Sequence, residues 1–65
     1  MMTVTAEEIK NVAKSAGLGW NDGDKDGEII VGTSYDHGCL LYKKFIENGA
    51  VMWAVEGGFG IRETQ

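Results

Sequence analysis

The strongest chemical signal in the sequence is a run of acids, Asp22-Gly23-Asp24-Lys25-Asp26-Gly27-Glu28. A calcium-binding loop of the EF-hand type has ligands at positions 1, 3, 5, 7, 9 and 12 and glycine at position 6. The three aspartates fit positions 1, 3 and 5, and Gly27 fits position 6. Position 12 is Thr33 instead of the usual bidentate glutamate. The pattern therefore predicts at most weak calcium binding, and a solvated turn is the simpler interpretation.

His37 and Cys39 are the other residues whose types could do chemistry. A structural zinc site needs four ligands, and these two residues are the only histidine and cysteine in the chain. A thiol nucleophile could use His37 as its base, but no oxyanion hole or substrate pocket is evident. We therefore expect no catalytic residues, no metal site and no cofactor.

The charge of the chain limits what it can bind. Ten acids against six bases give a formal net charge of −4, which argues against direct nucleic-acid binding. The same charge permits binding to a basic surface on another protein, or it serves solubility alone. One cysteine, no signal peptide and no apolar run of about 20 residues predict a soluble cytoplasmic protein without membrane association.

The elements that would position these residues begin with a helix over residues 6–16. Thr5 and Glu8 have the spacing of a capping box. Ile9, Val12 and Ala13 then recur at helical spacing on one face, and Gly17 is a typical C-terminal stop. A helix this short needs a surface to pack on.

Three strands are expected to provide that surface. The β-branched run at residues 28–33 predicts the first strand, and residues 39–46 and 50–56 predict two more joined by an Asn48-Gly49 hairpin turn. Residues 57–61 either fold over the sheet or add a short fourth strand. The predicted fold is α+β, with one N-terminal helix packed on a three-stranded antiparallel sheet (αβββ) in a single domain, residues 1–65.

The predicted hairpin would have two different faces. The face expected to contact the helix consists of Leu40, Tyr42, Ile46, Val51, Trp53 and Val55. The opposite face includes Leu41, Phe45 and Met52. These three side chains would either be covered by the C-terminal segment or form an exposed patch that binds a partner or a second copy.

The acids are concentrated enough to imitate a row of phosphates. Duplex DNA has one charge per ~1.7 Å of its axis, and a protein that holds DNA with lysine and arginine could bind a similar row of carboxylates. Trp20 and Tyr35 lie in predicted loops beside acids and could anchor such an interface. The expected partner-binding residues are Asp22, Asp24, Asp26, Glu28, Asp36, Trp20 and Tyr35. An ordinary solvated acidic surface is the alternative.

In size, acidity and order of elements, the whole chain resembles the small phage-encoded anti-CRISPR proteins, in particular inhibitors of type I-C CRISPR–Cas systems. The order is a helix, the acidic segment, strands and the Asn48-Gly49 turn before the last strand. The resemblance implies an inhibitor in the cytoplasm of a bacterial host. It implies binding to the basic DNA-binding surface of a Cas effector complex, at the large Cas8-type subunit that reads the protospacer-adjacent motif.

The placement of the acids at that interface is our inference from charge. We expect a monomer, with a homodimer as the other option. The alternative function is a small acidic protein-interaction or homodimeric module with a weak calcium-binding loop at Asp22–Glu28.

Overall fold

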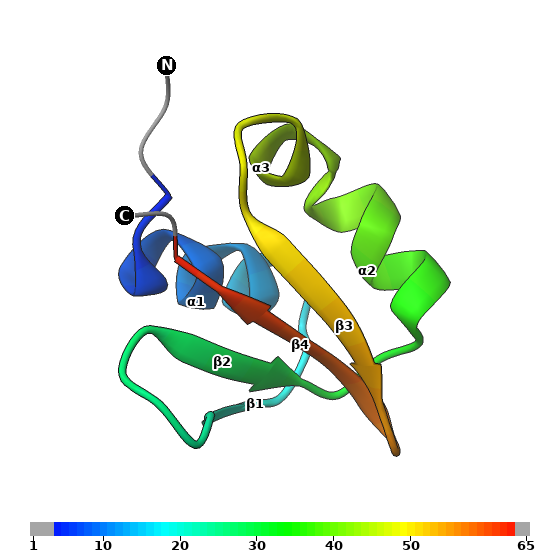
Figure 1. The fold of residues 1–65 in the computed structure, drawn as a ribbon. Coiled ribbons are helices and arrows are strands. Elements are labelled where there is room, and N and C mark those ends of the chain that lie inside the picture. The colour runs from blue at the N-terminus through cyan, green and yellow to red at the C-terminus, as the bar shows by residue number, and fades with distance from the viewer. Residues whose placement is uncertain (1–3, 64–65) are drawn as a thin grey trace.

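The computed structural model describes residues 4–63, which form two layers, a four-stranded antiparallel sheet and a layer of helices on one of its faces (Figure 1). The helices are α1 (Ala6–Ser15), α2 (Tyr35–Leu41) and α3 (Lys43–Glu47). The strands are β1 (Trp20–Asp22), β2 (Glu28–Val31), β3 (Val51–Val55) and β4 (Gly58–Arg62). They are arranged in the order β1-β2-β4-β3, so β1 and β3 are the two edges. The predicted α+β class is confirmed.

Helix α1 forms as its sequence predicts. The Thr5 hydroxyl accepts a hydrogen bond from the Glu8 backbone N–H at 3.2 Å, which satisfies one of the free donors at the helix start. Ile9 and Ala13 are buried against the sheet. The helix ends at Ser15, and Gly17 follows with a φ of 73°.

The prediction of a strand at residues 39–46 is wrong, because this segment belongs to α2 and α3. The Ser34 hydroxyl accepts a hydrogen bond from the His37 N–H at 3.2 Å and starts α2. Gly38 lies so close to the Phe59 ring that a Cβ there would overlap the ring. The missing side chain therefore lets α2 pack directly on β4.

The predicted Asn48-Gly49 hairpin is also wrong. Asn48 ends α3, where its side-chain amide donates to the Lys44 carbonyl at 2.8 Å, and Gly49 has a φ of 97°. Strand β3 pairs instead with β4, across a turn at Glu56 and Gly57. The fourth strand was only one of two options for residues 57–61, yet β4 is a central strand that pairs with both β2 and β3.

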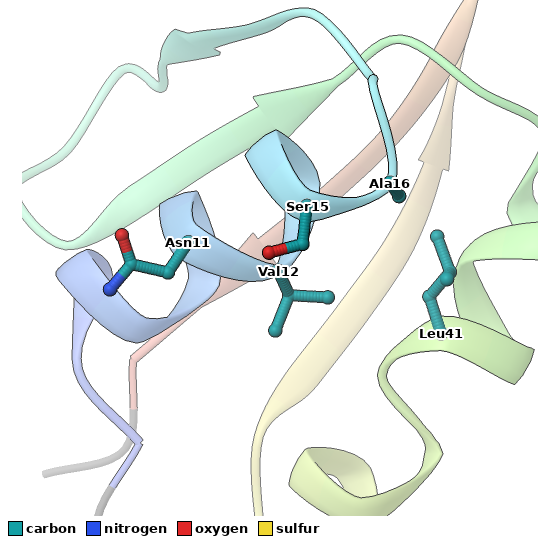
Figure 2. Close-up of a pocket in the computed structure, with 5 residues that line it drawn as sticks. All are labelled: Asn11, Val12, Ser15, Ala16 and Leu41. Carbon is teal, nitrogen blue, oxygen red and sulfur yellow. The ribbon is translucent and has the colours of Figure 1, made fainter.

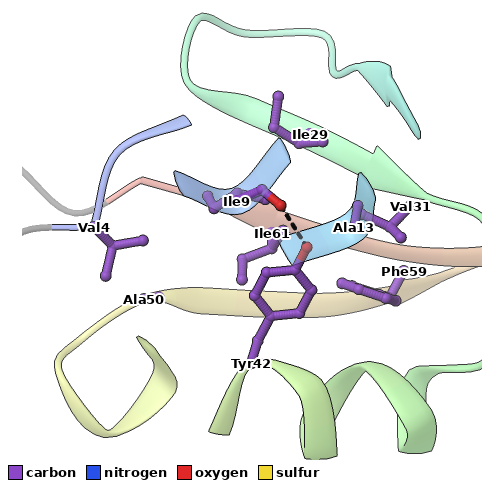
Figure 3. Close-up of a cluster of buried hydrophobic side chains, with 9 residues drawn as sticks. All are labelled: Val4, Ile9, Ala13, Ile29, Val31, Tyr42, Ala50, Phe59 and Ile61. Carbon is purple, nitrogen blue, oxygen red and sulfur yellow. Dashed lines mark hydrogen bonds between the residues drawn. The ribbon is translucent and has the colours of Figure 1, made fainter. Parts of the chain in front are cut away.

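The core lies between the helices and the inner face of the sheet (Figure 3). Tyr42, which joins α2 to α3, is fully buried, and its hydroxyl donates to the Ile9 carbonyl of α1 at 2.6 Å. Its ring meets the Phe59 ring edge-on, with 5.6 Å between centroids. Burial raises the pKa of Tyr42 to about 12. The buried hydrophobic residues are Val4, Ile9, Ala13, Ile29, Val31, Tyr42, Ala50, Phe59 and Ile61.

The two faces of the sheet differ from those predicted. Met52 pairs with Ile61 and points to the helices, whereas Trp53 pairs with Gly60 and lies on the outer face. A Cβ at Gly60 would overlap the indole, so Trp53 covers this glycine and is not a core residue. Leu41, Phe45 and Met52, for which the sequence left a covered and an exposed arrangement open, are partly buried against the core.

Candidate protein-binding site

The acidic segment is the connection between the two strands of the β1–β2 hairpin. Asp22 is the last residue of β1 and pairs with Ile29 of β2. The Gly23 N–H donates to the Glu28 carbonyl at 2.6 Å, and the Glu28 N–H donates to the Lys25 carbonyl at 3.1 Å. These bonds give the connection a defined backbone path. Asp24 and Asp26 are exposed at its tip.

Asp22 has a neighbouring positive charge that the local sequence does not indicate. Lys10 of α1 places its Nζ 3.6 Å from Asp22 Oδ1 and 4.7 Å from the centre of the Trp20 ring. Trp20 and Asp22 are two apart in β1 and so point to the same face, where the lysine lies between them. Lys10 therefore offsets part of the charge of Asp22 and holds the indole, which is 39% exposed.

Glu28 is also balanced by a base. It pairs directly with Arg62 of β4 on the outer face of the sheet, where opposite charges on paired residues attract. Between residues 4 and 63, the only ion pair is that of Lys10 with Asp22, so Asp24 and Asp26 have no such partner. Lys25 lies between them in the sequence.

Glu63 fixes the acidic connection to the start of α1. Its N–H donates to the Gly27 carbonyl at 3.0 Å, and its carboxylate accepts from the Ala6 N–H at 2.9 Å. The carboxylate also packs over Gly27, where a Cβ would lie 2.7 Å from Glu63 Oε1. Gly27 has a φ of 81°, a conformation that glycine adopts easily. The hairpin tip is thus held by Glu63, the residue that follows β4.

A polar hollow of ≈ 250 Å³ lies between this connection and the first turns of α1. Its walls include Lys10, Asp22 and residues 23–28. Within residues 4–63, no three side chains of the metal-ligating acids, histidine and cysteine come together around one point. Asp22, Asp24 and Asp26 are therefore not gathered around one point in this structure.

Asp36 and Tyr35 lie apart from the hairpin tip. Both are in the first turn of α2, which follows the opposite end of β2 (Figure 1). Strand β2 is four residues long, which corresponds to about 13 Å. Tyr35 is therefore not in a loop as predicted; it is 38% exposed, and a hydrogen bond with the Cys39 thiol raises its pKa. Trp20, also predicted in a loop, is in β1.

His37 and Cys39 point to different sides of α2. They are two apart in α2, and residues at this spacing on a helix do not face each other. The thiol is next to Tyr35 instead.

An apolar hollow between α1 and α2 had no counterpart in the predictions. It measures ≈ 380 Å³, and Leu41 of α2 lies across from Val12 and Ala16 at its walls (Figure 2). Asn11 and Ser15 complete the lining. The hollow lies between two helices and not at the acidic tip.

No protein-family model matches the chain, and neither the curated proteins nor the solved structures include one that is significantly similar to it. No helix within residues 4–63 has both the length and the apolar character needed to cross a bilayer.

Proposed function

We propose that the protein is an inhibitor that binds the basic DNA-binding surface of a Cas effector complex and prevents target DNA from binding. The single observation that carries the proposal is the hairpin tip, where exposed Asp24 and Asp26 have no ion-pair partner and the backbone is fixed. The resemblance to anti-CRISPR proteins directs the proposal to the Cas8-type subunit of a type I-C complex in a bacterial cytoplasm. The protein acts by occupying this surface, without catalysis.

The rigid tip favours this function for an energetic reason. A loop that is ordered before binding loses less conformational entropy when it meets its partner. Three bonds order this tip, from Gly23 to Glu28, from Glu28 to Lys25 and from Glu63 to Gly27. Lysine and arginine side chains that normally hold phosphates can then approach Asp24 and Asp26. Such association is fast and weakens as salt increases.

The seven predicted interface residues contribute unequally in this proposal. Asp24 and Asp26 make the central contact, and Asp22 joins them if a basic partner displaces Lys10. Trp20 lies on the same hairpin and adds an aromatic contact at its edge. Glu28 remains next to Arg62, and Asp36 and Tyr35 belong to a separate part of the surface.

The test is a competition between this protein and DNA for a purified type I-C effector complex. Labelled target duplex is mixed with the complex and increasing amounts of inhibitor at two salt concentrations. We expect DNA to be displaced, with less displacement at high salt. The triple variant Asp22→Asn, Asp24→Asn and Asp26→Asn should need about tenfold more protein for the same effect, a change of about 1.4 kcal/mol in binding.

A matched control separates the hairpin from net charge. The variant Glu7→Gln, Glu47→Gln and Glu56→Gln also removes three charges, all from exposed residues outside the acidic connection. It should inhibit nearly as well as the wild type. Equal weakening of both variants would show that only net charge matters, and no displacement of DNA by the wild type would exclude this function for the type I-C complex.

A further inference from the structure

Strand β3 is an edge strand with one side open. It pairs with β4 over residues 51–55, and the pairing runs without a bulge. In an antiparallel ladder, alternate residues direct their backbone groups to opposite sides, so part of the N–H and C=O groups of β3 point away from β4. Within residues 4–63, no backbone hydrogen bond from another element reaches them.

The helical layer leaves part of β3 accessible. Helix α2 packs against both β3 and β4, and its Gly38 is in contact with the Phe59 ring of β4. On β3 itself, Val51 is 43% exposed and Ala54 is also exposed. Side chains on both faces of β3 therefore remain accessible beside the helical layer.

The sequence of β3 lacks the charged residues and the proline that commonly prevent edge pairing. Soluble proteins protect such edges with charged residues, proline, bulges or very short strands. Strand β3 reads Val-Met-Trp-Ala-Val and has no charge and no proline. The other edge, β1, has only three residues, ends in Asp22 and has Lys10 beside it. Only one of the two edges is thus suited to pairing.

We propose that β3 pairs antiparallel with β3 of a second copy of this chain, with Trp53 opposite the partner's Trp53. This register joins the two four-stranded sheets into one continuous sheet around a two-fold axis. The inference is independent of the proposed inhibitor function. Of Leu41, Phe45 and Met52, which the sequence analysis placed on one face of the hairpin, only Met52 lies in this interface.

In this register, the residues of β3 are complementary in size to those of the partner's β3. Val51 lies opposite the partner's Val55, and Met52 lies opposite the partner's Ala54. The first pair joins two residues of one size, and the second joins a large side chain to a small one. Val51, Trp53 and Val55 all lie on the outer face, so the pairing extends one apolar strip across both copies.

The charges around β3 also favour this arrangement. Each copy has a net charge of −4, but the acidic hairpin is at the opposite edge, about 14 Å away across three strand spacings. Glu56 follows the end of β3. Ala50 precedes its start, and the Ala50 N–H donates a hydrogen bond to the Phe45 carbonyl of α3 at 3.0 Å. Antiparallel pairing brings the partner's Glu56 to α3, whose charged residues Lys43, Lys44 and Glu47 sum to +1.

Solution mass as a function of concentration tests the pairing. The wild type should shift from 7.1 kDa to twice that mass as concentration increases. Val51→Lys adds a charge to the β3 edge and should weaken the dimer by about tenfold or more. Asn21→Lys adds the same charge to the exposed β1 edge and should leave the dimer unchanged. Circular dichroism verifies that both variants fold.

A pair of cysteines tests the register. In a Cys39→Ser background, Val51→Cys and Val55→Cys would lie opposite each other across the axis, with Cβ atoms about 4.5–5.5 Å apart. Within one chain the two positions are about 13 Å apart, too far for a disulfide. Oxidation should therefore give a covalent dimer, and Cys39→Ser alone should not.

Two results would overturn the proposal. A mass of one copy at every concentration, with no crosslink, would rule out the dimer. A doubled mass that Val51→Lys leaves unchanged, or that the cysteine pair does not trap, would show that another surface or register is used.

Discussion

The two hairpins of the sheet have the same antiparallel geometry but opposite chemistry. Every residue of β1 is exposed, and its connection to β2 is held by polar contacts with Lys10 and Glu63. In the β3–β4 hairpin, Phe59, Gly60 and Ile61 are buried, and β3 has no charge. The comparison indicates a division of roles. Strand β4 stabilises the fold, whereas β1 and the acidic connection can be altered for binding with little loss of stability.

The largest difference in stability is expected when one aromatic residue of each hairpin is truncated to alanine. Phe59→Ala should lower the free energy of unfolding by about 3–5 kcal/mol, because it removes a fully buried ring between Tyr42 and Gly38. Trp20→Ala removes a partly exposed ring from the edge strand β1, and we expect a loss of about 1 kcal/mol or less. Urea unfolding at neutral pH measures both.

Trp53 provides the control for this first comparison. It belongs to the β3–β4 hairpin but lies on the outer face over Gly60, outside the core. Trp53→Ala should therefore be less destabilising than Phe59→Ala. If Trp20→Ala destabilised the protein as much as Phe59→Ala, the division between a stabilising and a variable hairpin would be wrong.

At high pH, ionisation of Tyr42, which packs above β4, should lower the free energy of unfolding by about 2–3 kcal/mol. The ordinary pKa of tyrosine is 10.0, and burial raises the pKa of Tyr42 to about 12 in the folded protein. The folded state thus favours the neutral phenol. The resulting stability is fully present below pH 10 and is lost as the pH rises through about 12. Its size follows because a tenfold difference in acidity between the folded and unfolded states corresponds to about 1.4 kcal/mol.

Tyr42→Phe isolates this contribution from the other groups that titrate at high pH. The variant loses the hydrogen bond to the Ile9 carbonyl, a difference of about 1 kcal/mol at neutral pH. Between pH 10 and 12, the stability of the wild type should fall more steeply than that of the variant. Parallel pH curves would mean that ionisation of Tyr42 is not linked to unfolding.

The sequence predicts the elements whose signals are local. Thr5 and Glu8 are three residues apart, so the start of α1 is evident from the chain itself. Residues 39–46 are ambiguous, because Leu40, Tyr42 and Ile46 fit a strand while Gly38, Leu41, Tyr42 and Phe45 fit a helix. The contact between Gly38 and Phe59 goes with the helical conformation of this segment. The two residues lie 21 positions apart, so the local sequence does not indicate this contact.

The candidate site shows the same limit. The exposure of Asp24 and Asp26 follows from their residue types and the glycines around them. The charge balance of Asp22 and Glu28 does not follow from the local sequence, because Lys10 and Arg62 reach them from distant parts of the chain. Sequence patterns identified the acids, and only the fold shows which of them have a neighbouring base.

The smallest expected change in the free energy of unfolding is for substitutions of Glu63. These variants test whether Glu63 orders the acidic hairpin. Its carboxylate accepts from the Ala6 N–H, one of the donors at the start of α1 that lack a partner within the helix, and its charge lies at the positive end of the helix dipole. Glu63→Ala should lower the free energy of unfolding by about 1 kcal/mol. Glu63→Gln retains an acceptor oxygen and should lose less, about 0.3–1 kcal/mol.

The more informative measurement on these two variants is hydrogen exchange. In Glu63→Ala, the amides of Gly23 and Glu28 should exchange faster, because the connection loses the carboxylate that packs over Gly27. The amides of Gly60 and Ile61 in the buried strand β4 should change only as much as global stability does. Uniform acceleration across both hairpins would mean that Glu63 supports the whole fold, and that the acidic hairpin has no local anchor of its own.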